Sequence, residues 1–168
     1  MFVRAKVFHQ LNGFDADYFA HMEEIDLCWR MKNIGYKIFV VPQSQVYHLG
    51  GGTLNKISAQ KTYLNFRNNL VTYTKNHANR FLLIKIIYRL ILDSVAALKF
   101  LLEGAPKHFI AVIHAHFSYY KMLPTTLVKR RKLKSISTYK PTVSGILNNN
   151  IVLLHYIKKI NIFSKIDF

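Results

Sequence analysis

The sequence contains little cysteine, little negative charge and no long uncharged apolar run. Its 168 residues include one cysteine, Cys28, which excludes an intrachain disulfide and any zinc site built from several thiolates. Eight acidic residues stand against 24 lysines and arginines, for a formal net charge of +16. The first residues lack the apolar core of a secretory signal, so none is expected. A hydrophobic fraction of 51%, with 14% aromatic residues, is enough for a folded core and excludes a disordered polymer.

The few acidic residues are unevenly placed. Residues 1–52 hold five acidic and five basic residues and are neutral overall. Residues 53–168 hold the other 19 basic residues and only three acids, so the whole excess of positive charge lies there. Carboxylate chemistry is therefore expected in the first third, and contact with an anionic surface in the remainder.

The first third predicts a helix flanked by short strands. Residues 1–8 alternate loosely, as a short strand does. Residues 18–33 predict a helix, because acids precede bases along it, the order that the helix dipole favours. The β-rich run 36–41 predicts a strand that stops at Pro42, and residues 45–48 a second short strand.

The sequence after residue 53 predicts mainly helices. Residues 80–103 and 108–123 are both apolar, and the charged residues of the first segment fall on one stripe, formed by Lys85, Arg89, Asp93, Lys99 and Glu103. Neither segment has the roughly 20 apolar residues that a membrane span requires. Helices that lie in a membrane interface, or that pack on each other, are expected instead. The charged stripe and the basic run 129–134 are expected to form a membrane-facing or solvated surface.

Six elements of the first third, taken in order, resemble the second half of the catalytic domain of family-2 inverting glycosyltransferases, especially the rhamnosyltransferase-like members. They are Gly13-Phe14-Asp15, the acidic segment Glu23-Glu24-Ile25-Asp26-Leu27 that continues to Arg30, Gly35-Tyr36, Val41-Pro42, His48 and Gly50-Gly51-Gly52.

The resemblance implies an α/β fragment. Residues 1–55 would be the acceptor-side part of a GT-A domain, made of short strands and a helix. Residues 56–125 would be amphipathic and apolar helices of a membrane-associated region, and residues 126–168 a basic, partly disordered tail. The protein would lie peripherally on the cytoplasmic face of a membrane, with an anionic membrane surface as a partner.

The resemblance also implies a reaction, in which a sugar passes from a nucleotide-diphosphate sugar to a cell-surface glycan or lipid-linked acceptor with inversion. Glu24 matches the family's general base, more often an aspartate. Asp26 matches an acid that helps to hold the acceptor, and Glu23 and Asp15 are further candidates for acceptor binding. His48 matches a ligand of a divalent metal, Mg or Mn. Gly50, Gly51 and Gly52 would form a flexible loop that lets the backbone approach a ligand closely.

Helical spacing gives a partly independent view of the acidic residues. Glu23, Asp26 and Arg30 are spaced three and four apart and share one face. Glu24 lies on another flank, with Cys28 and Met31, where a semi-apolar setting suits a general base. Ordinary first-turn acids favoured by the helix dipole would give the same three carboxylates without any catalytic role.

The sequence lacks the nucleotide-binding βαβ half of a GT-A enzyme and its metal-binding Asp-x-Asp, since Asp15-Ala16-Asp17 lies in the acceptor-side half. We therefore expect a C-terminal fragment, a split subunit or a truncated product, with a separate donor-binding half as a partner and little activity alone. Two alternatives remain open. One is a non-enzymatic basic module for membranes or nucleic acid, although no nucleic-acid-binding motif is present and nucleic acid is not expected as a partner. The other is a decayed gene product.

Overall fold

The computed structural model describes residues 1–47, 58–78 and 81–140, together with residues 154, 155, 158–160, 162 and 165. Within these residues the chain is built from helices and has no strand. The elements are α1 (Ala5–Gln10), the 3-10 helix η1 (Ala16–Tyr18), α2 (Glu23–Asn33), α3 (Ala59–Asn76), α4 (Leu82–Leu102) and α5 (Pro106–Lys134). The prediction of an α/β fragment with short strands is therefore wrong.

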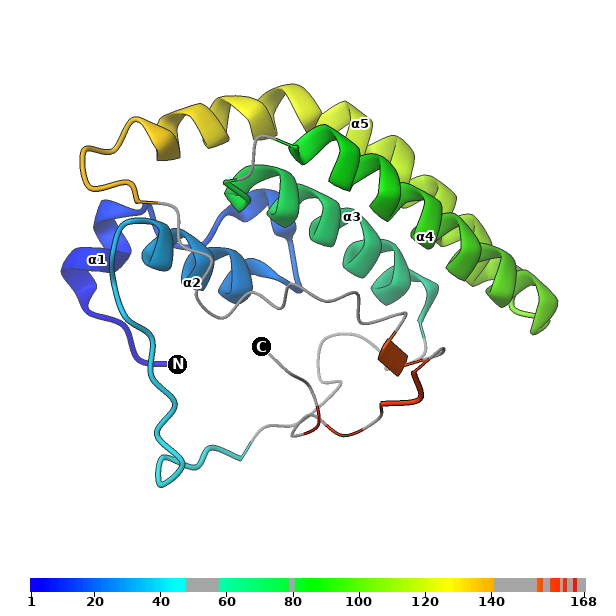
Figure 1. Ribbon diagram of the computed structural model, residues 1–168, viewed down its shortest axis with the longest axis horizontal. Helices are drawn as coiled ribbons and strands as arrows, with labels where there is room; N and C mark the ends of the chain where they lie inside the picture. The colour runs from blue at the N-terminus through cyan, green and yellow to red at the C-terminus, as the bar shows by residue number, and fades with distance from the viewer. Residues whose placement is uncertain are drawn as a thin grey trace.

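The β-rich run 36–41 is extended but unpaired. In Figure 1 it leaves the helices as part of a long segment after α2, and Val40 is 88% exposed. Its side chains fit a pleated surface only when another strand or a sheet face covers them. The structure places no strand beside this run among the described residues, so its β propensity is not expressed.

Residues 1–8 also differ from the prediction of a strand, because α1 begins at Ala5. Val7 and Leu11 lie four residues apart and are both buried against Leu27 and Met31 of α2. This i, i+4 spacing belongs to a helix, and it outweighs the loose alternation of the first residues.

The three long helices form most of the described structure. Figure 1 shows α4 and α5 running antiparallel beside each other, with α3 next to the pair, and α1 and α2 near one end of α5. One apolar cluster joins α1, α2 and Leu133 near the end of α5. A second joins Tyr18, Leu70 and Val71, Ile86 and Tyr119. The first third, which holds five of the eight acidic residues, is thus packed directly on the basic helices.

The helices expected at 80–103 and 108–123 are present as α4 and α5, and α5 continues through the basic run to Lys134. Among the described residues, no helix combines the length and the apolarity that crossing a bilayer requires.

Candidate functional site at the start of helix α2

The backbone is strained immediately before the predicted catalytic carboxylates. Phe19, His21 and Met22 have φ angles of 63°, 67° and 74°, and none of them is a glycine. Such values are uncommon for residues that carry a Cβ, and each costs about 1–3 kcal/mol. Met22 is the N-cap of α2 in a left-handed conformation, so the strained turn leads directly into Glu23.

Two side chains of α3 hold this turn. The amide nitrogen of Asn68 donates to the backbone carbonyls of Tyr18, Ala20 and His21 at 3.1, 2.8 and 2.8 Å. Asn68 is buried, and its amide oxygen accepts a hydrogen bond from Nε of Arg67 at 2.8 Å.

Arg67 also contacts the turn directly, with one guanidinium nitrogen 3.1 Å from the carbonyl of Asp17 and 2.9 Å from that of Tyr18. Five hydrogen bonds thus fix the entry into α2 from a helix about 50 residues later in the sequence. No local spacing in the sequence links Arg67 or Asn68 to α2, so neither was predicted to take part in this site.

Asp26 is the centre of a buried polar network. Its side chain is fully buried, and its carboxylate lies 2.7 Å from Nε of Arg30, 2.8 Å from Nζ of Lys75 and 2.8 Å from the amide of Asn76. The Tyr18 hydroxyl donates to the same carboxylate at 3.2 Å. The predicted pairing of Asp26 and Arg30 across one helical turn is confirmed. An acceptor-binding role for Asp26 stays a prediction, and the network itself shows Asp26 fixing α2 against α3.

Tyr18 remains protonated within this network. Burial, and then the negative charge of Asp26, raise the pKa of the Tyr18 phenol above its ordinary value of 10.0. The hydroxyl accepts a hydrogen bond from Thr72 at 2.9 Å while it donates to Asp26. The phenol therefore acts as a fixed hydrogen-bond link between α2 and α3.

Asp15 stands at the edge of the same network. Its carboxylate lies 2.7 Å from Nζ of Lys75 and 2.6 Å from Nζ of Lys129. Burial alone would raise the pKa of Asp15, but the hydrogen bonds from Lys129 and Lys75 outweigh it and lower that pKa to about 2. The Asp15 carboxylate is consequently ionised and bound to cations at neutral pH.

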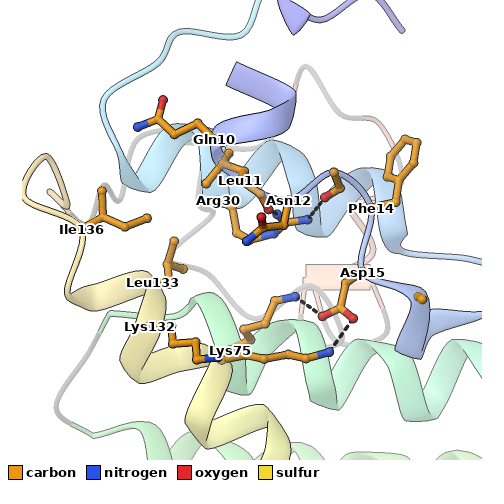
Figure 2. A pocket seen from close by; sticks show the side chains of 13 residues that line it. Gln10, Leu11, Asn12, Phe14, Asp15, Arg30, Lys75, Lys132, Leu133 and Ile136 are labelled. Atoms are coloured by element: carbon orange, nitrogen blue, oxygen red, sulfur yellow. Dashed lines mark hydrogen bonds and ion pairs between the residues drawn. The ribbon is translucent and has the colours of Figure 1, made fainter. Parts of the chain in front are cut away.

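A cavity of about 500 Å³ opens beside Asp15, between the loop after α1 and the end of α5. Its volume falls in the range of small-molecule sites, about 300–1,000 Å³. Figure 2 shows Asp15 and Lys75 on one side of it, with Arg30 behind. Arg30 donates to the carbonyls of Leu11 and Gly13 at 2.6 and 2.8 Å, which holds this loop in place.

Gly13 is required by the shape of the cavity wall. Its φ angle is 63°, and a Cβ at this position would lie 2.9 Å from the ring of Phe8. Any other residue would meet both backbone strain and a steric clash there.

The predicted site residues do not all come together. Of the five acids in the first third, Asp15 alone lines the described cavity, and Glu24 is exposed at the first turn of α2. Oε2 of Glu23 is buried without a hydrogen bond, as is Nε2 of His21 in the preceding turn. Glu24 does share a flank with Cys28, as predicted, since its charge adds to burial in raising the pKa of the Cys28 thiol.

The predicted metal site is not tested by the structure. His48, Gly50, Gly51 and Gly52 lie outside the described residues. Among the residues that are described, no three histidine, cysteine, aspartate or glutamate side chains are grouped to hold a metal ion. The site for Mg or Mn that the resemblance implies therefore stays a prediction.

The basic run 129–134 is partly turned inward. Nζ of Lys129 lies 2.6 Å from both Asp15 and Asp17, and Arg130 donates to the carbonyl of Thr74 at 2.7 Å. These two cations are used within the protein, where the sequence predicted a membrane-facing or solvated surface.

Comparison with known proteins gives one partial match. A stretch of 48 residues, 29% of the chain, is 42% identical to the rhamnosyltransferase WbbL of Escherichia coli (strain K12). The matched stretch spans 18% of the length of that curated relative. Neither any family model nor any solved structure matches the chain. The comparison thus supports a relationship to a glycosyltransferase over part of the chain.

Proposed function

We propose that this chain carries the acceptor side of an inverting glycosyltransferase site, with Glu24 as the general base. The observation that carries the proposal is the 48-residue stretch that is 42% identical to a rhamnosyltransferase. Support from the geometry comes from the strained turn before α2, since strain of this kind gathers at functional sites.

The proposed reaction uses Glu24 as an exposed carboxylate on a fixed helix. An acceptor hydroxyl lies against the first turn of α2, and the Glu24 carboxylate takes its proton. The hydroxyl oxygen then forms a bond to the anomeric carbon of a nucleotide-activated sugar. The bond from that carbon to the diphosphate oxygen breaks, the diphosphate leaves with the electron pair, and the configuration at the carbon inverts. A nucleotide-activated rhamnose is the first donor to test, given the relative's name.

The remaining polar residues position this carboxylate. Asp26 pairs with Arg30 within α2 and ties α2 to Lys75 and Asn76 of α3, while Asn68 fixes the turn that precedes Glu23. A general base contributes only when its carboxylate is held within hydrogen-bond reach of the reacting hydroxyl. We assign this positioning to the α2–α3 contact.

The test uses a hybrid protein, in which the part of the relative that precedes the matched stretch is joined to the full chain. Glu24→Gln keeps the size of the side chain and removes the base, so transfer is expected to fall by about 10²–10⁴-fold. Glu24→Asp restores a carboxylate and should recover part of the rate. Glu23→Gln is the matched control, with a smaller effect expected. Undiminished transfer by the Glu24→Gln hybrid would remove Glu24 from the mechanism.

A further inference from the structure

The outward face of α4 is apolar along its whole length. Exposed aliphatic side chains recur every three or four residues, and Leu102 at the end is 89% exposed. The series is Ile84, Ile87, Ile91, Val95, Leu98 and Leu102. A helix of 21 residues is about 31 Å long at 1.5 Å per residue. Soluble surfaces rarely leave so long an apolar stripe uncovered without an interaction that uses it.

The middle of the charged stripe of α4 faces the other way, toward the protein. Asp93 is buried, accepts a hydrogen bond from Nε of Arg89 at 2.7 Å, and lies 3.6 Å from Nε2 of His116 on α5. Lys85, on the same stripe, lies 3.2 Å from Nε2 of His77. The sequence predicted that this stripe would face a membrane or solvent. The structure leaves Lys99 and Glu103 exposed, turns Asp93 and Lys85 toward the protein, and leaves the apolar stripe outside.

Helix α5 adds exposed apolar side chains close to its contact with α4. The contact between Asp93 and His116 fixes which side of α5 meets α4. Ile113 and Tyr120 lie about one turn before and after His116, and Phe117 lies next to it. All three are exposed, and Figure 1 shows the two helices side by side. We call the exposed apolar side chains of α4 and of these α5 residues the α4–α5 face.

The rim of the α4–α5 face is basic. Lys99 of α4 is exposed at the helical position next to the apolar stripe. Lys107 and Lys121 of α5 are exposed on the flank that approaches Tyr63 of α3, beyond the apolar residues. Glu103 is the exposed acid at the end of α4, and it lies 3.7 Å from Lys99.

We infer that the α4–α5 face lies in the interface of an anionic lipid bilayer. Its aliphatic side chains enter the boundary between headgroups and acyl chains, and the rim lysines meet the anionic headgroups. Tyrosine and phenylalanine side chains near the rim suit the headgroup level. Charge complementarity favours an anionic bilayer over a second copy of the chain as the partner of this face. Two copies docked face to face would bring their basic rims together. The inference uses none of the residues of the proposed transfer reaction and stands apart from it.

Vesicle sedimentation tests the inference on the full chain. Vesicles of phosphatidylcholine with about 30% phosphatidylglycerol should bind the protein at least tenfold more tightly than pure phosphatidylcholine, and added salt should weaken the binding. The double variant Ile91→Glu, Leu98→Glu places two charges on the face and should lower binding by about tenfold or more. Phe39→Glu, Val40→Glu is the matched control, because it makes the same charge change at exposed apolar residues outside the face and should keep most of the binding. Circular dichroism checks that both variants remain helical.

Three outcomes would overturn the inference. Equal vesicle binding by the two double variants would show that the α4–α5 face is not the contact. Equal binding to anionic and neutral vesicles would remove the role of the lysine rim. A dimer in sedimentation velocity that Ile91→Glu, Leu98→Glu dissociates, without vesicle binding by the unmodified chain, would assign the face to a second copy.

Discussion

The ammonium group of Lys75 lies 2.8 Å from the carboxylate of Asp26, and both side chains are buried. The two residues belong to α3 and α2, far apart in the sequence, so their ion pair ties the first third of the chain to the basic helices. Arg30 pairs with Asp26 as well, and Asp15 links Lys75 to Lys129, which also pairs with Asp17, so that three cations face three carboxylates. These buried ion pairs therefore hold the start of α2 in place, where Glu24 is exposed.

Removal of the charge on Asp26 should destabilise the protein strongly. Asp26→Asn leaves buried Lys75 and Arg30 with too little negative charge, which costs about 3–5 kcal/mol in the free energy of unfolding. Urea denaturation measures this difference. Glu24→Gln makes the same acid-to-amide change at an exposed position and should alter stability by less than about 0.5 kcal/mol. Similar losses in the two variants would show that the buried pair does not contribute as described.

The hold of Asn68 on the strained turn can be tested with an isosteric change. Asn68→Asp replaces the amide donor with carboxylate oxygens that face the carbonyls of Ala20 and His21, so the turn should loosen. Hydrogen exchange should become faster in residues 19–26, with a loss of about 1–3 kcal/mol in the free energy of unfolding. Asn69→Asp is the matched control on the neighbouring residue. Unchanged exchange in the Asn68 variant would contradict the role of α3 in holding this turn.

The Asp15 contacts predict a loss of stability in strong acid. Because the pKa of Asp15 is lowered from 3.8 to about 2, its ionised form stabilises the folded chain. That contribution is fully present above about pH 4 and is lost as the pH falls toward 2. The difference in unfolding free energy between the unmodified chain and Asp15→Asn should therefore shrink from pH 4 to pH 2. A difference that stays constant over this range would contradict the ion pairs with Lys75 and Lys129.

The lowered pKa of His77 predicts a separate loss of stability in milder acid. Burial, and then the positive charges of Lys85 and Arg130, together lower the pKa of His77 from 6.5 to about 4. The unfolded chain takes up this proton first, so stability falls as the pH drops from about 6.5 to about 4 and then levels off. His77→Gln should remove this decline. A titration of the histidine ring signals by NMR checks the same point, and a His77 midpoint near 6.5 would contradict it.

Local spacing predicted several parts of the molecule. The order of acids and bases indicated α2, apolar length indicated α4 and α5, and the i, i+4 spacing predicted the Asp26–Arg30 pair. These features depend on neighbours within one or two turns of a helix, which a single sequence displays directly.

Contacts between distant segments could not be predicted in the same way. Nothing in the sequence near Asn68 shows that its amide reaches a turn 47 to 50 residues earlier. The charged stripe of α4 was visible, but the sequence does not say which face of a helix its neighbours cover. The run 36–41 has β-forming side chains, yet strand formation depends on a partner that the run itself does not encode.

The central claim is that this chain supplies an acceptor side to sugar transfer. The most direct measurement compares sugar transfer by the hybrid with transfer by the relative's preceding part alone, using nucleotide-activated rhamnose and a panel of lipid-linked glycan acceptors. The account predicts that both proteins bind the nucleotide and that only the hybrid releases nucleotide diphosphate with an equal amount of glycosylated acceptor. A folded, nucleotide-binding hybrid that transfers no more sugar than the preceding part alone would contradict the claim.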